Sequence, residues 1–319
     1  MKKPLIVLTG PTAVGKTKLS IALAKAVNGE IISADSMQVY RHMDIGSAKI
    51  TPEEMDGVPH HLVDVLEPTE DFNIVLFQQM AKDAMDKIYD KGRIPILVGG
   101  TGFYIQSVTR DIDFTSSDQD EHYRRELEEL AEQKGPAFLH DMLAKVDPKS
   151  AEDIHENNVK RVIRALEFYK QNGTRISEHN EEQKEHTSPY ALAYFVLNAP
   201  RPLLYERIDT RVDEMLKNGL TEEVKKLREM GCHRGMVSMQ GLGYKEILDW
   251  MGGNYSYEEA VRVLKRDTRH FAKRQLTWFR RERDVRFLYL PEFDNDRERV
   301  LEHILQELAA EAGIMECDS

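Results

Sequence analysis

The residues best suited to chemistry lie near the start of the chain and form one glycine-rich segment. Its members are Gly10, Pro11, Thr12, Ala13, Val14, Gly15, Lys16 and Thr17. They match the spacing G-x-x-x-x-G-K-S/T, whose glycines permit a tight turn with backbone N–H groups aimed at phosphate oxygens. Lys16 would add a positive charge, and the Thr17 hydroxyl could ligate Mg²⁺. We therefore predict a site for a phosphate or diphosphate here, with Mg²⁺ as the cofactor.

A phosphate loop of this kind needs a strand before it and a helix after it, and the sequence supplies both. Residues 4–9 are a short β-branched run typical of a buried parallel strand. Residues 16–27 carry apolar side chains at helical spacing, and residues 30–34 make a second apolar strand. Strand, loop, helix and strand in this order form a βαβ unit. We predict an α/β fold with a P-loop NTPase-like core and a central parallel sheet.

The rest of the core is expected to extend this unit. Strands are predicted at residues 61–66, 94–98 and 191–197, and a helix is predicted at residues 73–89. The chain from Leu203 to its end is expected to be mostly helical.

Residues 115–196 differ in texture, because they are densely charged and carry apolar side chains at helical intervals. We predict a helical insertion domain here, set between two core segments, residues 1–114 and 197–319. The insertion also has a basic cluster, made up of Lys160, Arg161 and Arg164.

Two polar positions follow predicted strands, at the edge where parallel sheets bind their ligands. Asp35 comes directly after residues 30–34, where a carboxylate could act as a general base or as a Mg²⁺ partner. The same residue could instead begin a helix as its N-cap, and its position alone does not decide. Thr101 lies within residues 99–102, a glycine-rich segment after another predicted strand, so it is either near the site or part of an ordinary turn.

Two further pairs of residues have suggestive spacing. His60 and His61 resemble metal ligands, but neighbours in an extended segment point to opposite faces, so we interpret them as structural. Arg207 and Arg211 are four residues apart, on one face of a helix. They could clamp a phosphate in bidentate fashion, or they could lie on a solvated helix face, and the sequence leaves both interpretations open.

A basic segment, residues 262–286, contrasts with an otherwise acidic chain. It holds ten Lys or Arg against three acidic residues, whereas the formal net charge of the whole chain is −11. Four of its basic residues recur at helical spacing and form a stripe, namely Arg262, Arg266, Arg269 and Lys273. Such a stripe, with aromatic residues interleaved, suits a nucleic-acid backbone and splayed bases. A helix that merely solvates its charges is the alternative.

Composition excludes several classes of protein. The chain of 319 residues has two cysteines, Cys232 and Cys317, and neither lies in a paired ligand spacing, which excludes a disulfide framework and a cysteine-based zinc finger. No stretch approaches 18 consecutive apolar residues, so we expect no membrane span. We expect a cytoplasmic protein, and a monomer, because no apolar helix face is left unexplained.

Taken together, these residues resemble one known family, the tRNA dimethylallyltransferases, also called tRNA isopentenyltransferases. The resemblance covers nearly the whole chain. It is carried by the segments GPTAVGKTKLS (10–20), DSMQVY (35–40), MDIGSAK (43–49), VPHHLVD (58–64), VGGTGFY (98–104), RVIRALE (161–167), QGLGYKE (240–246) and TRHFAKRQLTWFR (268–280). The last two segments are specific to the family, whereas many enzymes share the phosphate loop.

The resemblance implies transfer of a dimethylallyl group from dimethylallyl diphosphate to the exocyclic amine of the adenine immediately 3′ of the anticodon in tRNA, with release of diphosphate. It implies that Asp35 is the base and Thr101 its partner, and that Lys16 stabilises the leaving group. The phosphate loop and Arg211 would bind the diphosphate, and the core and the insertion would hold the tRNA anticodon stem-loop. The implied tRNA contacts are Asp35, Ser36, Met37, Gln38, Thr101, Tyr123, Arg124, Lys160, Arg161, Arg164, Gln240, Gly243, Tyr244, Lys273, Arg274, Gln275, Trp278 and Arg280.

Three alternatives remain. An adenylate isopentenyltransferase shares the phosphate loop and the segment 35–40 but needs no anticodon grip, so the basic segment and the insertion favour tRNA. A small-molecule kinase would use the same loop to hold ATP. An RNA-binding module with a vestigial nucleotide fold is disfavoured by intact Lys16, Thr17 and Asp35.

Overall fold

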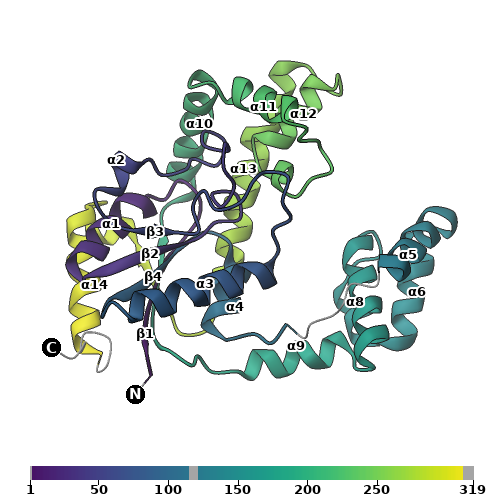
Figure 1. Ribbon diagram of the computed structural model, residues 1–319, viewed down its shortest axis with the longest axis horizontal. Coiled ribbons are helices and arrows are strands. Elements are labelled where there is room, and N and C mark those ends of the chain that lie inside the picture. Colours follow the sequence, from purple (N-terminus) through teal and green to yellow (C-terminus); the bar gives the residue numbers. More distant parts are fainter. Residues whose placement is uncertain (1, 115–120, 312–319) are drawn as a thin grey trace. The chain divides into compact units, whose positions relative to one another are not determined.

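The structure is a computed structural model that describes residues 2–114 and 121–311 (Figure 1). The chain divides into two compact units. Residues 1–109 and 188–319 form the core unit, and residues 110–187 form the insertion unit. Cys317 and the predicted domain boundary at residue 115 lie outside the described residues.

A parallel sheet organises the core unit. In the described part of the chain it has six strands in the order β3-β2-β4-β1-β5-β6, and every pairing between neighbours is parallel. The strands are β1 (Pro4–Thr9), β2 (Gly29–Ala34), β3 (His60–His61), β4 (Ile94–Gly99), β5 (Ala191–Asn198) and β6 (Val285–Tyr289). The predicted α/β fold with a central parallel sheet is confirmed.

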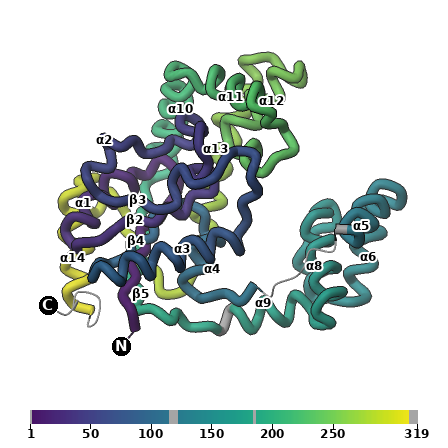
Figure 2. The backbone as a smooth tube through the Cα atoms, viewed as in Figure 1, coloured from purple at the N-terminus to yellow at the C-terminus, as the bar shows by residue number. Residues whose placement is uncertain are grey.

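Helices bury both faces of this sheet, which explains why its central strands are continuous apolar runs. In β1, Leu5 and Val7 join the core on one face, and Ile6 and Leu8 join the core on the other. The first face is covered by α3 (Ile74–Tyr89), α4 (Gly102–Thr109) and α13 (Tyr257–Phe279). The second is covered by α1 (Lys16–Ala26) and α14 (Arg297–Ala310). Figure 2 shows α14, from the end of the chain, running beside α1.

One prediction about the strands was wrong. The strand predicted at residues 61–66 is only the short β3, because the backbone turns into left-handed conformations at Leu62 (φ 62°) and Asp64 (φ 57°). The segment after residue 203 is mostly helical, as predicted, and its one strand in the described residues, β6, adds to the sheet beside β5. This strand is an edge strand, and Arg286 interrupts its apolar run, so its apolar signal is weak.

The remaining core helices are short connections and a helical cluster from the second half of the chain. They are α2 (Pro52–Met55), α10 (Arg201–Lys217), α11 (Leu220–Glu229), α12 (Tyr244–Met251) and the 3₁₀ turns η1 (Ser238–Gln240) and η2 (Leu290–Phe293). Cys232 is buried and free.

The insertion unit is helical and has an apolar core of its own. Its helices are α5 (Glu121–Lys134), α6 (Pro136–Val146), α7 (Pro148–Asp153), α8 (Val159–Asn172) and α9 (Ile176–Glu185). Leu127, Leu143 and Val162, from three different helices, are fully buried in that core. The compact unit ends at residue 187, before the predicted boundary at residue 196, and β5 belongs to the core sheet.

A buried carboxylate ties the insertion unit together. Asp147 accepts hydrogen bonds from the backbone N–H and the hydroxyl of both Ser150 and Ser177. Burial alone would raise the pKa of Asp147, but these hydrogen bonds outweigh it and hold that pKa below its ordinary value. The side chain thus joins the start of α7 to the start of α9.

Candidate active site at the carboxyl edge of the sheet

The glycine-rich loop leaves the carboxyl end of β1 in a conformation that requires its glycines. Gly10 has φ 144°, and a Cβ at this position would lie 2.5 Å from the carbonyl oxygen of Leu197. Gly15, with φ 106°, precedes the first turn of α1, and no side chain of the described residues caps that helix. The first N–H groups of α1 therefore remain available to an anion.

Lys16 lies over this loop. Its Nζ donates hydrogen bonds to the carbonyl oxygens of Gly10 (2.8 Å) and Pro11 (2.9 Å). Burial lowers the pKa of Lys16 to about 8, the charge of Asp35 opposes this shift, and the charge of Arg211 adds to it. These three charged side chains are therefore close enough to interact.

Asp35 directly follows β2 and begins a turn. Its Oδ1 accepts a hydrogen bond from the backbone N–H of Met37 at 2.9 Å, and residues 36–39 form a turn rather than a helix. The N-cap alternative for Asp35 is therefore wrong. Burial, with the charge of Asp35 as a second cause, raises the pKa of Tyr104 to about 12, which places the α4 tyrosine near this carboxylate.

Thr101 lies beside Asp35 because the ends of β2 and β4 are adjacent. The backbone N–H of Thr101 donates to the carbonyl oxygen of Ala34 at 3.2 Å. Gly99 allows this approach, since a Cβ there would lie 2.2 Å from that same carbonyl oxygen. The alternative in which residues 99–102 are only a remote turn is excluded, because the segment adjoins the phosphate loop and Asp35.

The arginine pair on α10 faces the phosphate loop. Nη1 of Arg207 donates to the carbonyl oxygen of Val14 at 3.5 Å. Burial lowers the pKa of Arg211, although Asp35 and two glutamates act in the opposite direction. Arg211 is half-buried among these groups, which does not fit a solvated helix face, so the arrangement favours the phosphate clamp.

Gln275 connects two loops of the site. Its Oε1 accepts the N–H of Thr12 at 2.9 Å, and its Nε2 donates to the carbonyl oxygen of Gly100 at 2.9 Å. The residue is only 6% exposed. The predicted tRNA contact does not fit this side chain, because its amide is buried and is bonded to the protein backbone.

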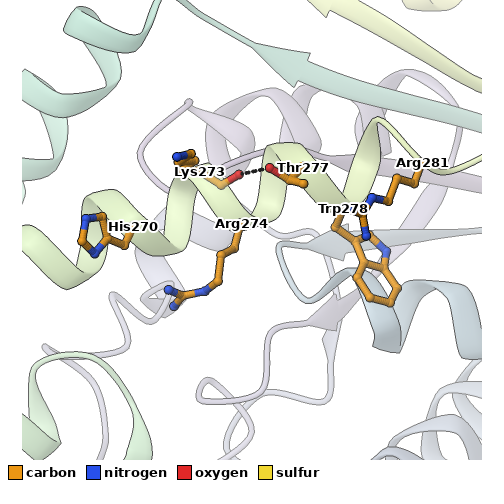
Figure 3. A pocket seen from close by; sticks show the side chains of 6 residues that line it. All are labelled: His270, Lys273, Arg274, Thr277, Trp278 and Arg281. Atoms are coloured by element: carbon orange, nitrogen blue, oxygen red, sulfur yellow. Dashed lines mark hydrogen bonds between the residues drawn. The ribbon is translucent and has the colours of Figure 1, made fainter. Parts of the chain in front are cut away.

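Other predicted contacts gather in a hollow on α13, drawn in Figure 3. This open hollow of about 360 Å³ is lined by His270, Lys273, Arg274, Thr277, Trp278 and Arg281. Thr277 bonds to the carbonyl oxygen of Lys273 and so lies against its own helix. Sequence reasoning missed His270 and Arg281, although each lies one helical turn from a predicted contact.

An aromatic side chain borders this hollow. The Trp278 ring lies 5.9 Å from the exposed ring of Phe103, centroid to centroid. A Cβ at Gly102 would lie 2.2 Å from the Trp278 ring, so the indole packs directly on the segment that carries Thr101. Its Nε1 has no hydrogen-bond partner among the residues that the structure describes.

The predicted basic stripe is only partly free to bind nucleic acid. Arg262 pairs with Glu259, Arg266 pairs with Asp267, and Arg269 pairs with Asp209 of α10. Lys273 is the member of the stripe that lines the hollow. The helical period correctly placed these residues on α13 but could not reveal their acidic partners.

Tyr244 and Gly243 are also buried, against the prediction that they contact tRNA. Tyr244 is 0% exposed, and its hydroxyl donates to Glu223 at 2.8 Å and accepts the N–H of Ser47 at 3.1 Å. Glu223, which sequence reasoning missed, also accepts the N–H groups of Asp44, Ile45 and Gly46. The side chain of Tyr244 therefore holds the segment 43–49 in place.

The other predicted contacts are divided between the two units. In the core unit, Ser36, Met37 and Gln38 are half-buried in the turn after Asp35, and Arg280 is exposed at the end of α13. Gln240 is exposed but is bonded to Arg234.

In the insertion unit, Lys160 and Arg161 are exposed and Arg164 is half-buried. Arg124 forms a bidentate pair with the buried Glu167 at 2.8 and 2.7 Å, which raises the pKa of Arg124. The ammonium of Lys170 lies 3.7 Å from the ring centre of Tyr123.

The histidine pair forms β3, the outer strand of the sheet beside β2. Nε2 of His61 is 2.7 Å from Glu30, the second residue of β2, which also pairs with Lys91 and Arg93. Nδ1 of His60 is 2.8 Å from the carbonyl oxygen of Val58, and burial lowers its pKa. The two histidines are structural, as interpreted. Within residues 2–114 and 121–311, no three His, Cys, Asp or Glu side chains cluster as a metal site would require.

This geometry can be set against known proteins. Residues 38–282 match the model of the IPP transferase family, and residues 3–64 match that of the isopentenyl transferases. The chain belongs to the IPP transferase family. This family includes enzymes from bacteria and eukaryotes that are similar to the chain over most of its length.

Two curated relatives of the chain are tRNA dimethylallyltransferases. The protein of Lachnoclostridium phytofermentans is 64% identical over 92% of this chain and 94% of its own length. The protein of Carboxydothermus hydrogenoformans is 49% identical over 98% of this chain and 99% of its own length.

Solved structures agree with this family. The tRNA isopentenylpyrophosphate transferase of Bacillus halodurans is 47% identical, with 98% of each chain covered and a TM-score of 0.73. A eukaryotic dimethylallyltransferase, described as acting on tRNA, is 31% identical and has a TM-score of 0.80, with 97% of this chain and 80% of that chain covered. These structures confirm the P-loop NTPase-like core. In the described part of this chain, no helix is long and apolar enough to cross a bilayer.

Proposed function

We propose that this chain is the enzyme that transfers a dimethylallyl group from dimethylallyl diphosphate to the exocyclic amine of the adenine immediately 3′ of the anticodon in tRNA. The proposal rests on the arrangement at one edge of the sheet, where a phosphate loop, a carboxylate and a half-buried arginine lie within interaction range. Membership of the IPP transferase family supports the same assignment.

We assign the leaving group to residues 10–17. In the reaction the allylic C–O bond breaks and its electron pair goes to the diphosphate. Backbone N–H groups of the loop, the open first turn of α1, Lys16 and Arg211 place positive charge where the diphosphate becomes more negative. The internal hydrogen bonds of Lys16 keep its ammonium at the loop, from which it can turn to a phosphate oxygen.

We assign the acceptor side to Asp35 and Thr101. The adenine nitrogen forms the new C–N bond, and its proton passes to the carboxylate of Asp35. The turn at Asp35 occupies Oδ1 with the Met37 N–H, which fixes the carboxylate in direction. Thr101 lies next to it through the pairing of its backbone with Ala34. The adenine has to leave its stack to reach this edge, at a cost of a few kcal/mol.

The donor atoms available fit Mg²⁺, which would supply positive charge to the diphosphate oxygens. The hydroxyl of Thr17 makes no hydrogen bond to any described residue, and Asp35 adds a carboxylate at the same edge. Hydroxyl, carboxylate and phosphate oxygens are the ligands that Mg²⁺ prefers, and one or two protein groups usually suffice. We therefore propose Thr17 as a ligand, with Asp35 as a carboxylate at the same edge of the sheet that could complete the site.

We propose that tRNA phosphates bind the exposed cations of both units. In the core unit these are Lys273, Arg274 and Arg281 of the hollow, with Trp278 available to a base. In the insertion unit they are Lys160 and Arg161. Because every assigned residue comes from one chain, we propose a monomer acting in the cytoplasm, where its tRNA substrate is found.

To test this function, the protein is incubated with Mg²⁺ and with dimethylallyl diphosphate that carries a label. The acceptor is unmodified tRNA in one sample and AMP in a second, and a third sample has no acceptor. We expect label on tRNA, at the adenine beside the anticodon, and none on AMP. Label on AMP alone would instead identify an adenylate isopentenyltransferase, which the match over residues 3–64 makes the second candidate. Hydrolysis of ATP without prenyl transfer would identify a phosphotransferase.

A further inference from the structure

The amide of Gln275 is a bridge between the two loops that the proposed reaction brings together. It accepts a hydrogen bond from the backbone N–H of Thr12 in the phosphate loop. It also donates a hydrogen bond to the carbonyl oxygen of Gly100, in the segment that carries Thr101. The bridge joins residues 263 positions apart in the chain, so neither loop could make it locally. On its own helix, Gln275 stands next to the buried Leu276 and is itself only 6% exposed.

Only an amide suits both ends of this bridge. One end must accept a hydrogen bond from an N–H group and the other must donate to a carbonyl oxygen, and a glutamine side chain has one group of each kind. A glutamate would turn an acceptor towards the carbonyl of Gly100. The approach is also close, since a Cβ on Gly100 would lie 2.2 Å from Nε2 of Gln275. The glycine at position 100 is therefore matched to the glutamine at 275.

The separation of these two loops matters for the chemistry. The phosphate loop would hold the leaving diphosphate, and Thr101 would lie beside the attacking amine, so the distance between loops sets the distance between reacting atoms. A displacement of about 1 Å in such an arrangement can cost about 100-fold in rate. Moreover, Gln275 directly follows Arg274, which lines the hollow proposed for tRNA.

We infer that Gln275 is a positioning residue for prenyl transfer: it fixes the phosphate loop relative to the Thr101 segment and ties both to the helix that carries the tRNA hollow. This role rests on the function proposed above. Gln275 touches neither substrate in this role, and its effect passes through the backbone of Thr12 and Gly100.

The first test is Gln275→Met, which keeps the length of the side chain and removes both hydrogen bonds. We expect kcat to fall about 10- to 100-fold, while the Kd for tRNA stays unchanged because the hollow is intact. We also expect inorganic diphosphate, measured by calorimetry without tRNA, to bind about fivefold more weakly, the effect of losing one hydrogen bond that orders its loop.

A second variant approaches the same contact from the other loop. Gly100→Ala places a Cβ where the Gln275 amide lies, and we expect the same loss of kcat as in Gln275→Met. In a Gln275→Ala background the amide is gone, so Gly100→Ala should cause little further loss. Additive effects of the two substitutions would overturn the bridge.

The matched control is Gln78→Met. Gln78 is also buried, at 8% exposure, and its Nε2 donates to the carbonyl oxygen of Ser107, away from the phosphate loop. We expect it to lower the unfolding temperature without lowering kcat. An equal loss of kcat in Gln78→Met, or wild-type kcat and diphosphate affinity in Gln275→Met, would reject the positioning role.

These results are separable from the proposed function. If the wild-type chain transferred no prenyl group to tRNA, the proposed function would fail. The diphosphate measurement would still decide whether Gln275 orders the phosphate loop, because it needs no acceptor.

Discussion

Asp35 combines a structural and a chemical task in one side chain. Its Oδ1 accepts the N–H of Met37 and so shapes the turn after β2, while the carboxylate as a whole stays within range of Lys16 and Arg211. A substitution that removes only its basicity must therefore keep an oxygen for the turn.

Asp35→Asn meets that condition, because the amide oxygen can still accept the Met37 N–H. We expect turnover to fall by at least about 100-fold, the scale on which a lost general base acts, with tRNA affinity unchanged. The measurement is single-turnover prenyl transfer together with tRNA binding. Asp56→Asn, at an exposed position paired with Lys25, is the control. Unaltered turnover in Asp35→Asn would rule Asp35 out as the base.

The lowered pKa of Lys16 predicts that the affinity of the protein for diphosphate depends on pH. Since its pKa is lowered to about 8, the ammonium is charged below that pH and neutral above it. We expect the affinity for inorganic diphosphate to fall as the pH rises through about 8, by up to about tenfold per unit.

The comparison is with Lys16→Met, measured by calorimetry from about pH 7 to about pH 9. Titration of diphosphate itself is common to both proteins, so the difference between the two pH profiles reports on Lys16. Parallel profiles would mean that the Lys16 charge does not act on the ligand.

At the scale of elements, α13 has one face that packs against the rest of the core unit and one face that is exposed. Gln275 and Leu276 face inward, whereas Lys273, Arg274 and Arg281 line the hollow. The basic residues also differ in whether they have an acidic partner. Arg269, for example, forms an ion pair with Asp209 of α10.

Because Arg269 has an acidic partner and Lys273 lines the hollow, we expect the two residues to contribute differently to the salt dependence of tRNA binding. We expect Lys273→Gln to weaken tRNA binding and to lower the slope of log affinity against log salt by about 0.7 to 0.9, the value for one phosphate contact. Arg269→Gln should leave that slope unchanged, because its guanidinium already has a partner. Binding titrations at several salt concentrations measure both. A slope lowered equally in the two variants would show that the Asp209 pair opens for RNA.

At the scale of the whole molecule, the chain is two compact units with separate apolar cores. In the insertion unit, Asp147 accepts four hydrogen bonds that join two of its helices. Its pKa in the folded protein lies below the ordinary value of 3.8. The stabilisation is therefore complete above that value and is lost as the pH falls through the lower, folded pKa.

Asp147→Ala at neutral pH should destabilise the insertion unit alone, because it leaves buried donors without acceptors at a cost of about 1–3 kcal/mol. We expect faster amide hydrogen exchange, by about 5- to 150-fold, within residues 121–185, and unchanged exchange within residues 4–109. Asp141→Ala, at an exposed position on α6, is the control. Equally faster exchange in both ranges would show that the two units unfold together.

Much of the active site could be predicted from the sequence, for a physical reason. The phosphate loop is a local motif, in which glycine spacing, an apolar strand and an amphipathic helix lie within a few tens of residues. Asp35 and Thr101 were placed at one edge because parallel strands end at the same edge of their sheet, and the pairing of Thr101 with Ala34 confirms that they lie together. The position of Lys16 close to Asp35 follows from the same local geometry.

The tertiary structure alone decided the contacts between distant parts of the chain. The family resemblance implied that Gln275 and Tyr244 contact tRNA, but their side chains are buried against Gly100 and Glu223. Sequence spacing also could not show that Arg269 pairs with Asp209. A residue's type and period determine its helix and its face, whereas its partner depends on which other segment packs there. That is why the sequence by itself determined the chemistry of this site, and the packing of α13 on two loops decided how the site is held.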